Sequence, residues 1–489
     1  MKTKLLFAWL RRVVAGSILA ASLPASWADA PQLVDDIRTT PQGYSSSPEN
    51  LCKLGSTLYF ARTDSAHGNE LWKSGGTSAS SVRVKDIFPG AFGSNPSDLT
   101  AVGSTLYFVA DNGVNGRELW KSDGTEAGTV MVKDIAAGGT FANGPVPRNL
   151  MAAGGMLFFT AVNPLYGREL WKSDGTAAGT GMVLDIYPGP AESFLAHFAV
   201  SGGTLYFAAF DPSHGLELWK SDGIAAGTAI VRDIVPGPDS GSPAGMTVVG
   251  GALYFVANDP AYGMELWKSN GTDTGTAPLK DIVTGLGGSM PRSLTAVGAD
   301  LYFSANDGVH GEEPWRSDGT GPGTVMVQDI MPGPESSSPY KFTGMTDSFG
   351  SRCYFLARSN FGFGLWASGQ FSGTMLVDMV SESPAPDRFV AAGDKLYFRY
   401  YTESQGYELW KCEGGSMALA ADIAPGPDSS IPDGLTAVDD TLYFAASNPL
   451  QGRELWKTDG FGFGASLVSN VEPGGVHLPP RWWRWVEAR

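Results

Sequence analysis

The sequence has 489 residues, including 64 glycines and 32 prolines, and only 17% of the residues are charged. Aromatic residues make up 11%, which excludes an intrinsically disordered chain, and the glycine and proline content indicates short strands and turns rather than helices. The formal net charge of −16 opposes nucleic-acid binding, which needs a basic surface, and favours neutral or cationic partners.

The N-terminal residues are typical of a secretory signal peptide. Four basic residues accompany an apolar stretch at 13–23 that is too short to span a bilayer. The small-x-small triplet at 26–28 predicts cleavage after Ala28, which would leave a mature net charge of −20 because the four basic residues are removed. We therefore expect a secreted protein, extracellular or at the cell surface. No later stretch is apolar enough to predict a transmembrane anchor.

After this leader, one sequence unit recurs nine times, and a Trp in the same context marks each copy. Successive gaps between these tryptophans are 48, 51, 48, 48, 48, 51, 44 and 46 residues. The repeated residues are Trp72, Trp120, Trp171, Trp219, Trp267, Trp315, Trp366, Trp410 and Trp456. The second unit is representative: segments at 99–102, 106–110, 118–121 and 130–135, rich in β-branched and aromatic residues, are separated by turn-forming residues. Each unit therefore predicts four strands.

A four-stranded unit of this size cannot bury both faces alone, so it must stack on its neighbours. We predict an all-β fold, a β-propeller of about nine four-stranded blades over residues 31–475. Fourth-strand segments occur ten times, because residues 33–37 and 467–471 both resemble one. This predicts a ring closed by N- or C-terminal strand exchange, which removes an exposed edge. Two smaller rings, or a ring with one unit left out, stay open as alternatives.

A longer motif is shared by most units, and in the second it reads Glu-Leu-Trp-Lys-Ser-Asp-Gly-Thr-Glu-Ala-Gly-Thr at 118–129. A Gly precedes the Trp by four positions in all nine units, and a Glu precedes it by two in eight, with Gly364 in its place in the seventh. This motif resembles the bacterial ELWxxDGT-repeat proteins, often labelled hyalin-like. The resemblance implies export and a propeller-like fold. It implies no established reaction and therefore no catalytic residue.

The repeated Trp and Glu favour structural roles. We expect each indole to lie in the core between adjacent blades, since a residue present in every unit usually serves the unit; stacking against a ligand is the alternative. The Glu shares a face with the Trp and must be paired, either by backbone N–H groups or by a neighbouring Arg or Lys. A catalytic pair of the glycosidase type is a further reading, but such pairs are single rather than repeated.

The Ser-Asp-Gly-Thr segment resembles the Asp-box turns of sialidase-type propellers. There the Asp side chain stabilises a hairpin by accepting bonds from backbone N–H groups. Calcium binding is the rival hypothesis, although the segment has few oxygen ligands for it. We predict no other cofactor and no metal site. The three cysteines, Cys52, Cys353 and Cys412, are expected to be isolated thiols, with a Cys353–Cys412 bridge as the alternative.

One repeat position, five residues before the Trp, varies from unit to unit. In a propeller the loops that carry it share one face with the connections between blades, opposite the Asp-Gly-Thr turns. Varied side chains on rigid loops suit partner binding, and solvated loops without function are the plain alternative. These candidate binding residues are His67, Asn115, Tyr166, His214, Tyr262, His310, Phe361, Gln405 and Gln451.

These features favour a non-catalytic protein for binding, adhesion or extracellular matrix and surface interaction, with an extracellular polymer, glycan or protein surface as partner. The alternative is a propeller-scaffold enzyme acting on glycans, a hydrolase or lyase. It would need a polar cluster that breaks the repeat, to be sought around Arg352, Arg358, Asp387, Arg388, Arg399 and Tyr401. The Trp/Arg-rich tail at 476–489 has no ranked role, and the sequence leaves the oligomeric state open.

Overall fold

The computed structural model describes residues 32–35, 46–135, 146–347, 350–369, 373–449, 451–460 and 466–467. The predicted signal peptide, its cleavage point and the tail at 476–489 lie outside these residues. Apart from two short 3₁₀ helices, η1 (Ser78–Ser80) and η2 (Ala225–Gly227), the regular structure of the described residues consists of strands. None of the described helices is long and apolar enough to cross a membrane.

The strands form nine sheets, numbered here as blades in the order of their first strands. Blades one to three contain β2 (Glu49–Leu54), β3 (Thr57–Asp64), β4 (Gly68–Ser74), β5 (Val82–Lys85); β6 (Ser97–Val102), β7 (Thr105–Asp111), β8 (Arg117–Ser122), β9 (Val130–Lys133); and β10 (Arg148–Ala153), β11 (Met156–Asn163), β12 (Gly167–Ser173), β13 (Gly181–Leu184). Blades four to six contain β14 (Ala196–Ser201), β15 (Thr204–Asp211), β16 (Gly215–Ser221), β17 (Ala229–Arg232); β18 (Ala244–Val249), β19 (Ala252–Asp259), β20 (Gly263–Ser269), β21 (Thr276–Lys280); and β22 (Arg292–Val297), β23 (Asp300–Asn306), β24 (Glu312–Ser317), β25 (Val325–Met326). Blades seven to nine contain β26 (Tyr340–Asp347), β27 (Gly350–Ser359), β28 (Gly362–Gly369), β29 (Gly373–Met379); β30 (Asp387–Ala392), β31 (Lys395–Thr402), β32 (Gly406–Glu413), β33 (Ser416–Ala421); and β34 (Asp433–Val438), β35 (Thr441–Asn448), β36 (Gly452–Thr458), β1 (Gln32–Asp35), β37 (Ser466–Leu467).

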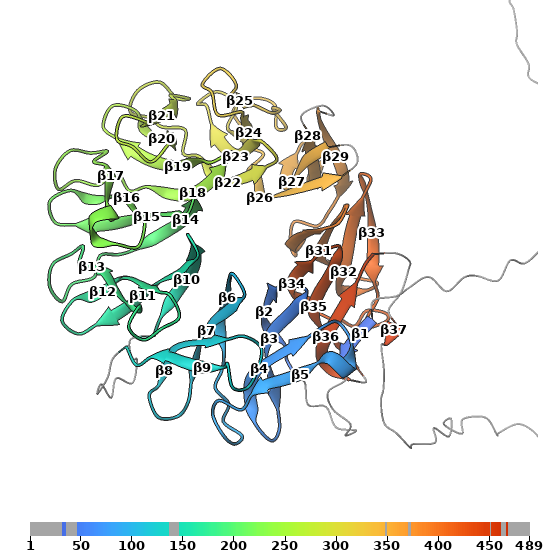
Figure 1. Cartoon of the computed structure of the whole chain (residues 1–489). Helices are drawn as coiled ribbons and strands as arrows, with labels where there is room; N and C mark the ends of the chain where they lie inside the picture. Colours follow the sequence, from blue (N-terminus) through green and yellow to red (C-terminus); the bar gives the residue numbers. More distant parts are fainter. Residues whose placement is uncertain are drawn as a thin grey trace, which may run out of the picture.

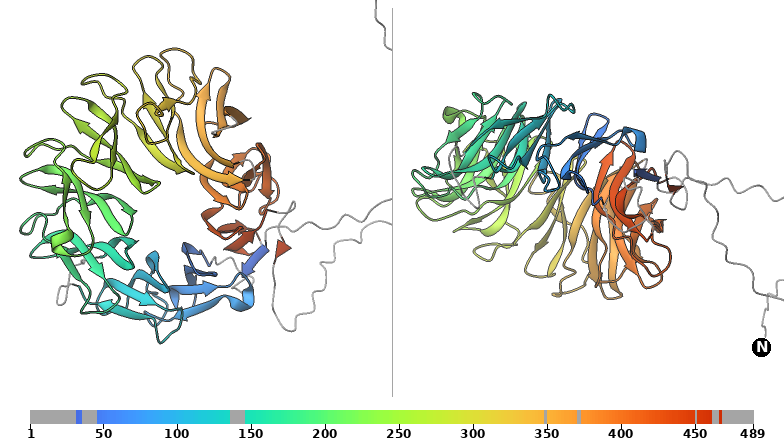
Figure 2. Two further views of the ribbon diagram at one scale, coloured as in Figure 1. Left: turned by 45° about the horizontal axis from the view of Figure 1, so that its top comes forward. Right: turned by 90° about the horizontal axis from the view of Figure 1, so that it is seen from below.

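The prediction of a nine-bladed all-β propeller is confirmed. The blades follow one another around a single ring, and the first strand of each blade lies nearest its centre (Figure 1). Figure 2 shows the ring from a tilted direction and edge-on. Within blades one to eight the strands are antiparallel and paired in chain order. Each first strand contains a register shift, as between Ser97 and Thr100 in β6, and Asp98 between them has a φ of 55°.

The ring is closed by the N-terminal strand. β1 pairs with β36 in antiparallel register, Gln32 opposite Lys457 and Leu33 opposite Trp456, and so takes the fourth position of blade nine. The described part of the C-terminal fourth-strand copy, β37, pairs in parallel on the other side of β1. Strand exchange at closure is therefore confirmed, with the N-terminal segment in the predicted position and the C-terminal one as a fifth strand.

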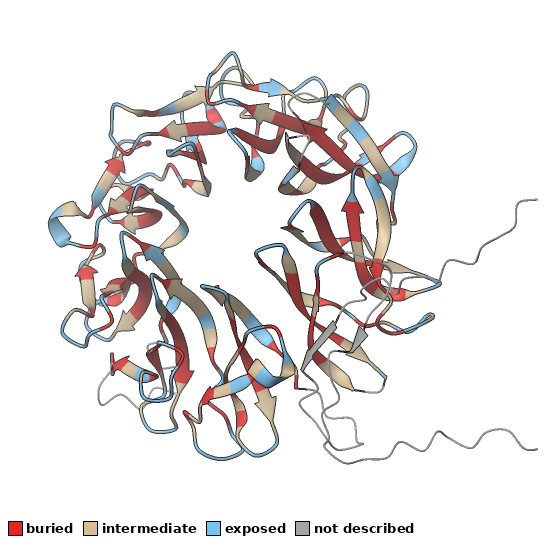
Figure 3. Ribbon diagram, turned by 45° about the vertical axis from the view of Figure 1, so that its right-hand side comes forward, coloured by how far each residue is buried: buried red, intermediate tan, exposed pale blue. Residues whose placement is uncertain are grey.

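The cores lie between neighbouring blades rather than within one blade. Between blades one and two, Leu71, Val84 and Ile87 pack with Phe108 and Trp120, and similar clusters recur around the ring. At closure, a cluster joins residues of blades one and nine. Buried residues accordingly gather along the strands and exposed ones on the connecting loops (Figure 3).

The repeated tryptophans take part in these clusters. Seven of them are buried, with relative exposures of 1–9%, and Trp72 and Trp410 are half-buried against the same kind of cluster. All three cysteines are free thiols, so a Cys353–Cys412 bridge is not formed.

Candidate functional site

The repeated Glu binds the connection that leads from its own blade to the next. Glu70 accepts hydrogen bonds from the backbone N–H groups of Ile87 and Phe88 and from both the N–H and the hydroxyl of Ser94, at 2.6–3.1 Å. Ile87 lies two residues after the fourth strand of blade one, and Ser94 lies three residues before the first strand of blade two. We call this set of bonds the Glu–Ser latch. It satisfies the buried carboxylate as the sequence predicted, with backbone donors, and adds a serine partner that the prediction lacked.

The latch recurs with a serine partner in blades three, five, six, eight and nine, whereas in blade two the described bond is the one that the Ile135 N–H donates to Glu118 at 3.1 Å. The eight carboxylates belong to Glu70, Glu118, Glu169, Glu217, Glu265, Glu313, Glu408 and Glu454. In blade four Gly241 replaces the serine and donates its N–H to Glu217 at 2.6 Å. In blade nine the partner is Ser46, whose hydroxyl donates to Glu454 at 2.6 Å. The closing contact therefore uses the same chemistry as the other joints.

The latched serine also binds the next blade. The carbonyl of Ser94 accepts the N–H of Asp111 at 2.9 Å, and that of Ser46 accepts the N–H of Thr63 at 2.9 Å. Because Asp111 and Thr63 end second strands, each joint connects a third strand, a linker and the neighbouring second strand. The repeated carboxylates are thus occupied in holding blades together.

Burial raises the pKa of Glu169, Glu217 and Glu408 to about 7, despite their hydrogen-bond donors. An unfolded Glu titrates near 4.5, so between pH 4.5 and 7 the folded protein keeps protons that the unfolded chain loses. Stability from these groups is complete below pH 4.5 and is lost as the pH rises through 7. We expect a higher melting temperature at pH 5 than at pH 8, measured by circular dichroism. Glu169→Gln, which cannot ionise, should reduce this difference, and a melting temperature that rises from pH 5 to pH 8 would contradict the assignment.

The Asp-Gly-Thr turns are stabilised from within and by the preceding blade. Asp123 Oδ1 accepts the N–H and the hydroxyl of Thr125 at 2.8 and 2.7 Å. Lys73 of blade one donates to the carbonyl of Gly124 at 2.8 Å. A Cβ at Gly124, where φ is +87°, would lie 2.3 Å from the hydroxyl oxygen of Tyr59, so this close approach requires glycine. The turn is a further joint between blades.

The geometry of the Asp-Gly-Thr turns bears on whether calcium stabilises the fold. The Thr125 bonds lower the pKa of Asp123 and occupy the carboxylate oxygen that they share. Within the described residues, no group of three His, Cys, Asp or Glu side chains could hold a metal ion. We therefore expect that EDTA leaves the melting temperature of the purified protein unchanged. A fall of several degrees on chelation, reversed by added calcium, would show that calcium stabilises the fold.

The nine loop residues proposed from the sequence lie one to a blade and are therefore spread around the ring rather than gathered in one site. His67, His214 and His310 each share a hydrogen bond with the Asp three residues earlier, at 2.7–2.9 Å. Asn115 bonds to Asn112 and Asp134. These side chains close their own loops, and so does Gln451, which bonds to Asn448. Gln405 is half-buried and donates its backbone N–H to Thr402.

Three members of this set are exposed over the whole residue. Phe361 has 87% relative exposure, and Tyr166 and Tyr262 have 37% and 38%. They belong to blades seven, three and five. The imidazoles of His214 and His310 are also partly exposed, with 42% and 37% of each side chain accessible, although each is held by its Asp.

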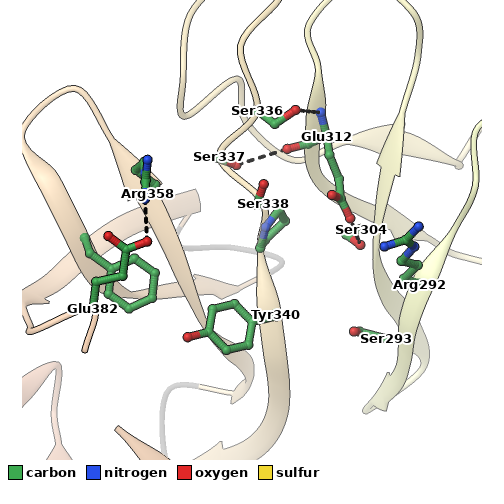
Figure 4. A pocket seen from close by; sticks show the side chains of 12 residues that line it. Arg292, Ser293, Ser304, Glu312, Ser336, Ser337, Ser338, Tyr340, Arg358 and Glu382 are labelled. Carbon is green, nitrogen blue, oxygen red and sulfur yellow. Dashed lines mark hydrogen bonds and ion pairs between the residues drawn. The ribbon is translucent and has the colours of Figure 1, made fainter. Parts of the chain in front are cut away.

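A polar cleft opens between blades six and seven. Its volume is about 570 Å³, and it lies at the end of the blades where Arg358 ends the second strand β27 and Glu312 begins the third strand β24. This is the face that carries the variable loops. Figure 4 shows the lining side chains, which come from both blades and from the linker at 336–339. The lining residues are Arg292, Ser293, Ser304, Glu312, Ser336, Ser337, Ser338, Pro339, Tyr340, Arg358, Phe363 and Glu382.

The cleft lies where the repeat breaks. Glu312 occupies a variable position that is Arg in three units, where Arg117, Arg168 and Arg453 donate to backbone carbonyls of the linker before their own blade, and it is the acidic residue at this position. Ser304 occupies a second-strand position that is mostly apolar elsewhere, and its hydroxyl donates to Glu312 at 2.7 Å. Blade seven is also the unit without the latch Glu. Glu312 and Ser304 were not predicted from the sequence, because the Glu312 position varies from unit to unit and a single polar residue on a strand is no distinctive signal.

Four of the six residues considered for a glycan enzyme lie together on blade eight, next to Asp433 of blade nine, and Arg358 and Arg352 lie apart from them. Arg358 lines the cleft and pairs with Glu382. Arg399 pairs with Asp387 within blade eight, and Arg388 pairs with Asp433 of blade nine at 3.1 Å.

The two remaining members of that set are Tyr401 and Arg352. Tyr401 lies beside Tyr407, with ring centroids 5.1 Å apart, and the guanidinium of Arg399 lies 5.6 Å from the same Tyr407 ring. The positive charge of Arg352 acts on Tyr354 and Cys412. Asp387, Arg388, Arg399 and Tyr401 therefore share one polar region of blade eight, whereas Arg358 and Arg352 lie elsewhere.

The sequence matches no protein-family model and no curated protein. Solved structures with a similar fold include the computationally designed protein Ika8, with 11% identity, a TM-score of 0.41, and coverage of 87% of this chain and 100% of that one. A puromycin hydrolase has 14% identity, a TM-score of 0.37, and coverage of 76% and 62%, so this chain spans 62% of its length. The β-propeller domain of the Trilobed protease from Pyrococcus furiosus has 14% identity, a TM-score of 0.36, and coverage of 75% and 96%. These likenesses concern the fold alone.

Proposed function

We propose that this protein is a secreted, non-catalytic propeller that binds an extracellular polymer, glycan or protein surface through the face carrying its variable loops. The observation that carries the proposal is the cleft between blades six and seven, which opens on that face where the repeat breaks. A polar cavity of about 570 Å³ lies within the range of roughly 300–1,000 Å³ typical of ligand sites. The leader-like N-terminus and the resemblance to ELWxxDGT-repeat proteins support the extracellular setting.

The repeated Glu and Trp side chains are engaged in contacts between blades, which supports a binding function rather than a catalytic one. The repeated carboxylates serve the latches, and the repeated indoles pack in the clusters between blades. What differs from blade to blade is the loop face, where Tyr166, Tyr262 and Phe361 are exposed. A rigid ring that presents varied side chains is suited to recognition.

The test uses the mature protein, residues 29–489, on a glycan array and on immobilised extracellular polymers and proteins. Two variants divide the face: Tyr166→Ala/Tyr262→Ala/Phe361→Ala removes the exposed loop aromatics, and Tyr340→Ala removes the ring that lines the cleft. Loss of a bound partner in either variant, with an unchanged circular dichroism spectrum, supports the proposal. A wild-type protein that binds nothing, or binds equally well in both variants, would overturn it.

A further inference from the structure

The side chains around the cleft divide into an engaged set and a free set. The engaged set builds the walls. Glu312 accepts the Ser304 hydroxyl, and its backbone N–H donates to Ser336 Oγ at 2.8 Å. Arg358 is paired with Glu382, so these two charges cancel (Figure 4).

The free set consists of Arg292, Ser293, Ser338 and Tyr340. Within the part of the chain that the structure describes, their side-chain polar groups make no hydrogen bond or ion pair with the protein. Arg292, Ser293 and Ser338 are exposed, and Tyr340 is half-buried with its ring 6.0 Å from that of Phe363 and 5.4 Å from Lys341 Nζ. Ser293 and Ser338 both have positive φ, 56° and 47°. The groups left for a ligand are therefore one guanidinium, three hydroxyls and the edge of an aromatic pair, beside the Glu312 carboxylate that accepts the Ser304 hydroxyl.

The charge of the ligand is inferred from the guanidinium of Arg292. The chain has 50 acidic and only 34 Lys and Arg residues, so carboxylates are abundant, yet Arg292 has no described carboxylate within ion-pair distance. Guanidinium groups match carboxylates through two parallel hydrogen bonds. Although the net charge of the whole chain favours neutral or cationic partners, an Arg left open inside this cleft, among hydroxyls and an aromatic ring, indicates an anionic group on the ligand.

The hydroxyls and the ring decide the rest of its chemistry. Serine and tyrosine hydroxyls both donate and accept, which suits a ligand that is itself rich in hydroxyls. The aromatic ring can pack on the apolar C–H face of a sugar ring. We propose that the cleft between blades six and seven binds acidic carbohydrate, with Arg292 holding the carboxylate of a uronic acid unit. This inference rests on the proposed binding function and names its ligand class.

The ring supplies a matched control for Arg292. Arg148 begins β10 as Arg292 begins β22; each is exposed, and each lies opposite a hydroxyl residue of the second strand, Thr160 and Ser304. Arg148 does not line the cleft. Arg292→Gln and Arg148→Gln therefore remove the same charge from equivalent positions of the fold.

The experiment measures binding of a uronic acid oligosaccharide and of its neutral methyl ester by isothermal titration calorimetry. We expect the acidic oligosaccharide to bind at least about tenfold more tightly than the ester, and Arg292→Gln to lose about tenfold while Arg148→Gln changes little. The third ligand is an oligosaccharide of uncharged sugars that carries sulfate groups and no carboxylate. If the protein binds it more tightly than the uronic acid oligosaccharide, the carboxylate assignment is overturned.

Two outcomes separate this inference from the proposed function. Equal binding of the acid and the ester, with loss in Tyr340→Ala, would overturn the acidic ligand and leave a binding cleft. Binding of another polymer or a protein that Tyr340→Ala abolishes, with no affinity for any oligosaccharide, would do the same. A protein that binds none of the tested partners would overturn both.

Discussion

Glu408→Ala is expected to lower the free energy of unfolding by about 3–5 kcal/mol at pH 7. Glu408 is fully buried and accepts the backbone N–H groups of Ile423, Ala424 and Ser430 at 2.9–3.3 Å, together with the Ser430 hydroxyl at 2.6 Å. Alanine would leave three buried N–H groups without an acceptor, at about 1–3 kcal/mol each before relaxation. Urea denaturation followed by tryptophan fluorescence measures the loss.

Ser430→Ala is the matched control for this latch. It removes one hydroxyl donor and leaves the carboxylate with its three backbone donors, so we expect a cost of only about 1 kcal/mol. Equal costs for the two variants would show that the carboxylate does not hold the linker. A stable Glu408→Ala protein would refute the role assigned to the latch throughout the ring.

Trp267→Ala is the second large effect, with an expected loss of about 3–5 kcal/mol. The indole is only 1% exposed and packs with Leu218, Val231 and Ile234 of blade four. Its own blade contributes Phe255, with ring centroids 6.2 Å apart. Truncation leaves a cavity between two blades that are joined along this surface.

An exposed aromatic of the same blade provides the comparison. Tyr262 has 38% exposure on the loop before the third strand, and Tyr262→Ala should change stability by less than about 0.5 kcal/mol. Differential scanning calorimetry of the three proteins tests the pair. A similar melting temperature for wild type and Trp267→Ala would contradict packing between blades as the source of stability.

The fold could be predicted from sequence because its signal is periodic. Each unit repeats the spacing of strand, turn and Trp, and this spacing fixes both the blade and its contact with the next one. The end that closes the ring could not be predicted, because residues 33–37 and 467–471 both resemble a fourth strand. Only the pairing of Leu33 with Trp456 distinguishes them.

The cleft could not be predicted because its residues are not one motif. Arg292 and Glu312 come from blade six, whereas Tyr340 and Arg358 come from blade seven, and each resembles an ordinary polar residue at a strand end. The loop residues were predicted from variability alone. His214 shows the weakness of that signal, since its ring bonds to Asp211 and a varied residue here can still serve its own loop.

The pairing of β1 with β36 sets an order of assembly. Gln32 lies opposite Lys457, so a chain synthesised from its N-terminus presents the closing strand long before the strand it must join. The ring can close only after the ninth blade has been synthesised, because β1 pairs with β36 of that blade. A chain that is truncated or clipped near either end would remain an open arc with two unpaired edges, and such edges pair readily with other chains. Closure therefore works as a check on completeness, because only a full-length chain can hide both of its edges.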